Sequence, residues 1–204
     1  GLGIGNIHKG LKLVLSNFIL KSMDAVCVRD ESSYKLAESV SAGANIKRAS
    51  DLVYCSQIVK DASQIVTDYN NEKMAIGITL VEPFLKKSQK KSEIIDALAK
   101  SCMRWVEDGY KIKLICFQEV LLDNGEMISD KKPLLEIRGR CDCDCIDIID
   151  MPNSAEEIGR VFSDLSLLVG MRFHGLLISA CYSIPFVGFS CDSKVSDICG
   201  QYAM

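Results

Sequence analysis

Apolar and polar positions along the chain follow two rhythms, one typical of buried strands and the other of amphipathic helices. Short apolar runs bounded by polar or turn-forming residues predict strands at residues 24–31, 74–81, 110–118, 145–150, 165–170 and 185–189. Apolar residues spaced three or four apart predict helices at residues 9–21, 32–43, 91–109, 154–163 and 173–183. Strand and helix therefore alternate along most of the sequence.

This alternation is typical of parallel α/β units, in which right-handed crossovers place the helices on the faces of the sheet. The fold class that we expect is α/β, with Rossmann-like parallel sheets. A polar stretch at residues 56–72 is the best candidate for a linker. We therefore expect one domain at residues 1–55 and a second at residues 73–204.

Composition and charge exclude several classes of protein. The chain has 204 residues, 48% of them hydrophobic, and a formal net charge of −3, which is the composition of a folded globular chain. Its longest apolar stretches span about ten residues, short of the roughly 18 to 20 that a membrane span needs. The sequence has no basic tail of the kind that would suggest binding to nucleic acid. No signal peptide is visible at the start, which is Gly1.

Ten cysteines raise the question of a disulfide framework or a metal site. Their spacing is irregular and several lie inside apolar patterns, so a reducing cytoplasm fits best. The one cluster, Cys141, Cys143 and Cys145, has a period of two, which on a strand puts all three thiols on one face. A zinc site usually needs a second ligand pair, so we expect no metal and favour a cysteine-rich edge strand.

Three residues that can carry positive charge stand in an otherwise apolar segment, GMRFHGLLISACYSIPFVGFSCDSK, at residues 170–194. Arg172 and His174 directly follow one expected strand, and Lys194 follows the next. In an open parallel sheet, ligands bind outside the carboxyl ends of the strands, where helix N-termini add partial positive charge and free N–H groups. This edge therefore predicts a binding site for a ligand with two or three negative charges.

Arg29 occupies the same kind of position in the first domain, at the end of an expected strand. Taken alone, each of these residues has an ordinary alternative. An arginine or lysine at a strand end is commonly solvated or paired with a carboxylate, and a histidine on a helix is commonly structural. The convergence of Arg172, His174 and Lys194 on one edge favours a functional site.

The glycine-rich segment GLGIGN is a weaker candidate. Gly3 and Gly5 are typical of a tight loop that approaches a ligand, but no strand precedes them as it does in a dinucleotide-binding fingerprint. His8 is interpreted as a surface loop residue.

The segment GMRFHGLLISACYSIPFVGFSCDSKV closely resembles the C-terminal motif of the polysaccharide pyruvyl transferase family, which runs from G-M-R-x-H through an apolar helix and a Pro-led strand to D-x-K. The segments GLGIGN, AVCVRDESSYKLAESVSAG and SDLVY resemble that family's glycine loop, V-R-D-E strand end and A-D-P-x-F segment, in the same order. The resemblance covers essentially the whole chain. It departs from the family at Asn6, Leu52 and Ser193, where prolines are common, without loss of a charged group.

The resemblance implies a two-domain arrangement similar to GT-B glycosyltransferases, with the active site between two Rossmann-like domains. It implies transfer of pyruvate from phosphoenolpyruvate to two hydroxyls of a sugar in a cell-surface glycan, forming a cyclic ketal. Arg29, Arg172 and Lys194 would bind the carboxylate and phosphate of the donor, and His174 would act as acid or base. No cofactor is expected, because side chains supply the positive charge.

The expected partners are phosphoenolpyruvate and a glycan acceptor, which can be lipid-linked at the membrane surface. The expected location is the cytoplasm, including the inner face of the membrane. Two alternatives stay open: a GT-B glycosyltransferase that uses a nucleotide sugar, and a non-catalytic relative that binds an anionic sugar. Because the glycine loop comes first, we expect residues 1–55 to be only the C-terminal part of a domain, and the chain alone to be inactive.

Overall fold

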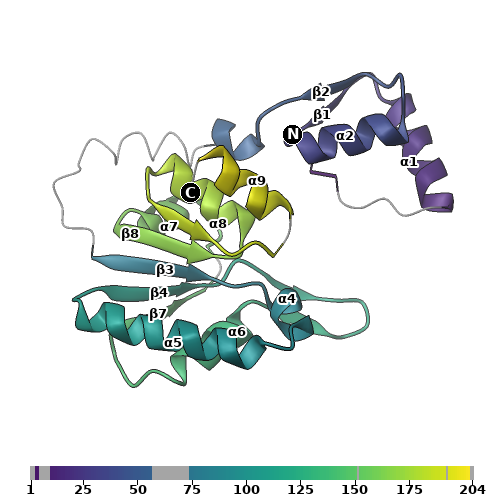
Figure 1. The fold of residues 1–204 in the computed structure, drawn as a ribbon. Helices are drawn as coiled ribbons and strands as arrows, with labels where there is room; N and C mark the ends of the chain where they lie inside the picture. Colours follow the sequence, from purple (N-terminus) through teal and green to yellow (C-terminus); the bar gives the residue numbers. More distant parts are fainter. Residues whose placement is uncertain (1–2, 5–9, 57–73, 151, 192, 203–204) are drawn as a thin grey trace. The chain divides into compact units, whose positions relative to one another are not determined.

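The computed structural model describes residues 3–4, 10–56, 74–150, 152–191 and 193–202. The chain divides into two compact units, Gly1–Ser56 (unit 1) and Gln57–Met204 (unit 2), which are described separately (Figure 1). Both units contain parallel strands joined through helices, so the expected α/β class is confirmed. Almost all of the expected linker lies outside the described residues. The GT-B arrangement and the truncation of the first domain stay predictions.

Unit 1 is a small α/β unit. Its elements are α1 (Leu11–Ser22), β1 (Val26–Val28), α2 (Glu31–Val40), β2 (Ile46–Arg48) and the 3-10 turn η1 (Leu52–Cys55). The two strands pair in parallel, and buried side chains of Leu20, Val26, Val28 and Ala37 form the core. Asp30 accepts a hydrogen bond from the backbone N–H of Ser33 at 2.6 Å. This N-cap explains why α2 begins directly after β1.

Unit 2 is built on a five-stranded sheet in the order β7-β4-β3-β8-β9, in which all neighbours are parallel. The strands are β3 (Ala75–Thr79), β4 (Lys111–Ile115), β7 (Ile146–Ile149), β8 (Leu165–Gly170) and β9 (Phe186–Gly188). The chain first adds strands on one side of β3 and then returns to its other side with β8. The strand order therefore reverses between β3 and β8, the kind of position where open α/β sheets bind ligands.

Helices cover both faces of this sheet (Figure 1). One face carries α5 (Lys91–Glu107) and α6 (Lys131–Arg138), with α4 (Glu82–Lys87) packed against both helices. The other face carries α7 (Ala155–Phe162), α8 (Phe173–Cys181) and α9 (Ser193–Gln201). All five residues of β3 are buried, as a central strand between two helical layers requires.

The strands and helices expected from the hydrophobic pattern are all present, with bounds shifted by a few residues. The pattern missed β2, the antiparallel hairpin of β5 (Glu119–Leu121) and β6 (Met127–Ser129), and the helices α4, α6 and α9. The missed helices have six to nine residues, so each offers only about two turns of helical pattern, although α7 and α8 were predicted at a similar length.

The prediction of a cysteine-rich strand at residues 141–145 was wrong. These residues form the loop and turn between α6 and β7, which begins only at Ile146. The backbone N–H of Cys141 donates to Arg138 O at 3.2 Å, and Arg138 Nη1 donates to Cys141 O at 2.9 Å. These bonds close the end of α6, so the chain cannot take up strand geometry there. The three thiols consequently do not share a strand face.

Candidate active site

Two helices begin at the carboxyl edge of the sheet in unit 2, close to the point where the strand order reverses. α8 follows β8 after Met171 and Arg172, and α9 follows β9. β3 and β8 approach each other closely at this edge. A Cβ atom on Gly170 would lie 2.0 Å from Thr79 Oγ1, so this position requires a glycine. The tight strand pair fixes the backbone from which Arg172 emerges.

Arg172 forms a two-pronged ion pair with Asp130, the residue before α6. Arg172 Nε donates to Asp130 Oδ2 and Nη2 donates to Oδ1, each at 2.6 Å. The Asp130 side chain is fully buried, and its Oδ1 also accepts from the backbone N–H of Glu82 at 3.2 Å. The carboxylate-paired alternative for Arg172 is therefore present in the structure, with an anion that the protein itself supplies.

This pairing leaves part of the Arg172 guanidinium for another acceptor. A guanidinium carries more N–H donors than the two that Asp130 engages. The side chain is also 22% exposed, whereas its partner is wholly buried. Asp130 thus fixes the orientation of the guanidinium without using all of its hydrogen-bonding capacity.

His174 is the second residue of α8, and its side chain is exposed. Its ring meets the ring of Phe173 edge-on, with centroids 5.3 Å apart. The first turn of a helix has backbone N–H groups without an acceptor inside the helix, and it carries partial positive charge. An exposed imidazole at this place can exchange protons with a bound anionic ligand.

Lys194 is the second residue of α9, and its side chain is half-buried. Because β8 and β9 are parallel neighbours, the helices that follow them start at the same edge of the sheet. No carboxylate among the described residues forms an ion pair with Lys194. The structure therefore places all three expected residues of unit 2 at one edge, as the sequence predicted.

Unit 1 carries Arg29 directly after β1 and pairs it with Asp51, directly before η1. Arg29 Nη1 donates to Asp51 Oδ2 at 2.5 Å, and Arg29 Nε lies 3.7 Å from Asp30 Oδ2. Gly3 packs against this guanidinium, since a Cβ atom there would lie 2.9 Å from Arg29 Nε. Two expected site residues, Gly3 and Arg29, are thus in contact. Gly5 lies outside the described residues, as does His8.

The start of α2 joins the glycine-rich segment to this arginine. The backbone N–H of Ile4 donates to Ser33 Oγ at 2.9 Å, and Ser33 N–H in turn donates to Asp30. Burial acts to raise the pKa of Asp30, but hydrogen bonds from Ser33 and Ser32 and the charge of Arg29 bring it below its ordinary value. Asp30 is therefore held as a carboxylate beside Arg29.

Sequence reasoning assigned no role to Asp130 or Asp51, the buried partners of the two arginines. A signal for Asp130 was present in the sequence. The pair Asn124 and Gly125, between two short apolar runs, is a strong hairpin signal. That hairpin ends on Asp130, just before the KKPLLEIR segment that forms α6.

The family model for polysaccharide pyruvyl transferases matches residues 1–193 of the 204. The chain belongs to the polysaccharide pyruvyl transferase family. No curated protein and no solved structure matches the chain significantly. The matched region includes Arg29, Arg172, His174 and both aspartate partners, and it ends one residue before Lys194. The family resemblance is confirmed, while the role of each residue stays a prediction.

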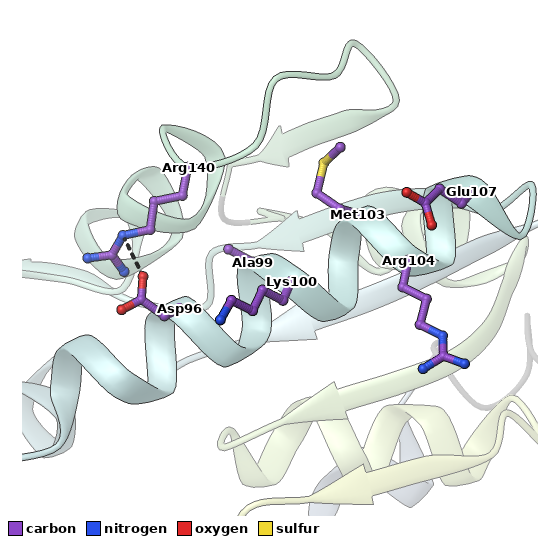
Figure 2. Close-up of a pocket in the computed structure, with 7 residues that line it drawn as sticks. All are labelled: Asp96, Ala99, Lys100, Met103, Arg104, Glu107 and Arg140. Atoms are coloured by element: carbon purple, nitrogen blue, oxygen red, sulfur yellow. Dashed lines mark ion pairs between the residues drawn. The ribbon is translucent and has the colours of Figure 1, made fainter.

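Two surface pockets of this polysaccharide pyruvyl transferase family member lie away from these residues. One, of about 480 Å³, runs along α5, where Asp96 and Arg140 form an ion pair at 3.4 Å (Figure 2). The other, of about 340 Å³, adjoins the start of α7 and is lined by Asp150, Asn153 and Arg160 among others. Neither of these two pockets is lined by Arg172, His174 or Lys194.

Among the residues that the structure describes, no group of three or more His, Cys, Asp or Glu side chains is arranged to hold a metal ion. Of the helices described, none combines the length and the apolar character needed to cross a bilayer.

Proposed function

We propose that this protein transfers a pyruvate unit from phosphoenolpyruvate to two hydroxyls of a glycan sugar and so forms a cyclic ketal. The observation that carries this proposal is the edge of unit 2, where Arg172, His174 and Lys194 stand at the starts of two helices beside the strand reversal. Membership of the polysaccharide pyruvyl transferase family supports the same class of reaction.

The chemistry of the donor fits this edge. Phosphoenolpyruvate carries a carboxylate and a phosphate, and the remaining donors of Arg172 suit either group, since a planar guanidinium matches both. Lys194 adds a point charge, and the N-termini of α8 and α9 favour negative charge at the same edge. Because Asp130 already holds the guanidinium in one orientation, less side-chain entropy is lost when the donor binds.

The proposed reaction has two steps. In the first, one sugar hydroxyl adds to the carbon that bears the phosphate, its proton is removed, and a proton is delivered to the methylene carbon. In the second, phosphate leaves and the second hydroxyl attacks the same carbon, which closes the ketal and releases a further proton. We assign one of these proton transfers to His174, as acid or base.

In unit 1 we propose the same charge-binding role for Arg29. Its guanidinium lies at a strand end against Gly3, and the engaged carboxylates, Asp51 and Asp30, come from the segments that follow β2 and β1. The proposed acceptor is a glycan, lipid-linked or free, and the proposed location is the cytoplasm, including the inner face of the membrane.

Titration calorimetry of the full-length protein with phosphoenolpyruvate, and separately with UDP-sugars, tests this function. We expect saturable binding of phosphoenolpyruvate that weakens as salt is added, and release of phosphate when a glycoside with two neighbouring free hydroxyls is present. Binding of UDP-sugars in place of phosphoenolpyruvate would identify a nucleotide-sugar glycosyltransferase. Binding without phosphate release across a panel of such glycosides would identify a non-catalytic relative.

A further inference from the structure

The loop between α6 and β7 carries three cysteines that the proposed reaction does not use. They differ sharply in surroundings although their spacing is the same. Cys141 is buried, and its thiol donates to Ala99 O at 3.6 Å. Cys143 is half-buried and Cys145 is exposed. Solvent therefore reaches the second and third thiols but not the first.

Cys143 and Cys145 are also in direct contact. The chain turns at residues 144–145, and the backbone N–H of Cys145 donates to Cys143 Sγ at 3.1 Å. The two thiols share a hydrogen bond, which raises the pKa of Cys145 above its ordinary value. Cys143 is only half-buried, so a small disulfide can reach its sulfur, and a thiolate is the form in which a cysteine attacks a disulfide.

Cys141 lacks both features. Burial raises the pKa of Cys141, so its thiolate is disfavoured. It also lies two residues from Cys143, as Cys145 does, so sequence spacing alone would allow either pair to form a bond. The structure separates the two pairs by access and contact.

We propose that Cys143 and Cys145 form a redox-active dithiol that closes to a disulfide by reaction with a small-molecule disulfide of the glutathione type. The Cys143 thiolate attacks one sulfur of the small disulfide, which breaks the S–S bond and releases one small thiol. The Cys145 thiolate then attacks Cys143 Sγ in the mixed disulfide and releases the second small thiol. Two protein thiols are oxidised, one small disulfide is reduced, and the thiol protons leave with the two small thiols.

The closed form should be readily reversed. A bond between cysteines separated by one residue closes a small, strained ring, and strained disulfides are more easily reduced. The sheet does not depend on these thiols, because Cys145 is anchored through its backbone carbonyl, which accepts from Ile112 N–H at 2.8 Å. The proposed redox reaction also uses none of the residues that we assign to pyruvyl transfer, so either proposal can fail without the other.

Peptide mass spectrometry of the folded full-length protein tests the proposal. The protein is treated with glutathione disulfide, its free thiols are blocked with N-ethylmaleimide, and it is then unfolded, blocked again and digested with trypsin. Cleavage after Arg140 and Arg160 yields a peptide that contains all three cysteines. We expect this peptide to contain a bond between Cys143 and Cys145, which makes it two hydrogen atoms lighter than the same peptide with both thiols reduced. Cys141 should carry N-ethylmaleimide that was added after unfolding. Dithiothreitol should restore both thiols.

Two variants provide matched controls. Cys141→Ser keeps the contacting pair and should form the same disulfide, whereas Cys145→Ser should trap glutathione on Cys143. In the untreated protein, N-ethylmaleimide should label Cys143 on the order of tenfold faster than Cys141. A wild-type peptide that stays fully reduced, that carries only glutathione, or that links Cys141 to Cys143 as often as Cys143 to Cys145 would overturn the proposal.

Discussion

Both units place an arginine within two residues of the end of a parallel strand and pair it with an aspartate from another segment, but the two ion pairs are built differently. In unit 2, Arg172 meets Asp130 through two hydrogen bonds, and the carboxylate is fully buried. In unit 1, Arg29 Nη1 donates to Asp51 Oδ2 at 2.5 Å, and Asp30 lies further away at 3.7 Å. The first arrangement fixes the guanidinium as a rigid fork, whereas the second holds it between two carboxylates and a glycine.

The difference teaches that a position at a strand end does not by itself define what an arginine does. The partner decides how much of the guanidinium is fixed and what its removal leaves behind. Each carboxylate would keep a backbone donor after loss of its arginine, Glu82 N–H for Asp130 and Val53 N–H for Asp51. Only Asp130 would be left as a fully buried charge, because the side chain of Asp51 is 9% exposed. Binding tests on either arginine therefore need a measurement of stability beside them.

The largest expected effect concerns His174 in unit 2. The described residues of unit 1 include no histidine. His174→Gln keeps similar bulk and hydrogen bonding but cannot transfer a proton. Turnover should fall by about two to four orders of magnitude, with much less change in affinity for phosphoenolpyruvate. Phosphate release under single-turnover conditions and calorimetry measure the two quantities. A variant that retains most of its turnover would make His174 structural.

The next effect separates the two ion pairs by stability. Arg172→Ala should destabilise unit 2 by about 3–5 kcal/mol, because the buried Asp130 loses its counter-charge. Arg29→Ala should cost less in unit 1, roughly 1–3 kcal/mol, because Asp51 keeps some contact with solvent and Asp130 has none. Hydrogen exchange of amides in β8 and in β1 reports on each unit separately. Arg160→Ala, at a pair in which both side chains are at least 70% exposed, is the control and should change little. Equal losses in both units would break the comparison.

Each arginine position could be predicted from the sequence, because an apolar strand followed by a charged residue is a local pattern. The partners could not. Asp130 lies 42 residues before Arg172, at the end of a hairpin, and only the folded sheet brings the two together. The prediction of a strand at the three cysteines was wrong for a related reason. The period of two at Cys141, Cys143 and Cys145 is real, but Cys141 is bonded to the end of α6 and residues 144–145 form a turn before β7 begins.

The smallest effect concerns Asp30, which caps α2 in unit 1 and has no counterpart as a side-chain cap at the start of α8. Asp30→Ala should cost about 0.5–2 kcal/mol through loss of the cap. The folded pKa of Asp30 is below its ordinary value of 3.8, so its charge stabilises the fold above that pH, and the stabilisation is lost as the pH falls through the folded pKa.

Asp30→Asn isolates this charge effect because it keeps an acceptor for the Ser33 N–H. The acid unfolding of wild type and Asp30→Asn, followed by exchange of the α2 amides, should differ in slope only below about pH 4. Parallel curves through that range would show that the Asp30 charge does not stabilise unit 1.

The central claim is that Arg172 binds the donor with the part of its guanidinium that Asp130 leaves over. The most direct measurement is calorimetric titration with phosphoenolpyruvate of the double variant Arg172→Ala with Asp130→Asn, in which no buried charge is left unpaired. Asp130→Asn alone is the control and should bind within a few-fold of wild type. The double variant should fold with near wild-type stability but bind about tenfold to a hundredfold more weakly, the loss of a charge-assisted hydrogen bond of roughly 1.5–3 kcal/mol. A folded double variant that binds phosphoenolpyruvate as tightly as wild type would show that Arg172 only neutralises the buried Asp130 and does not bind the donor.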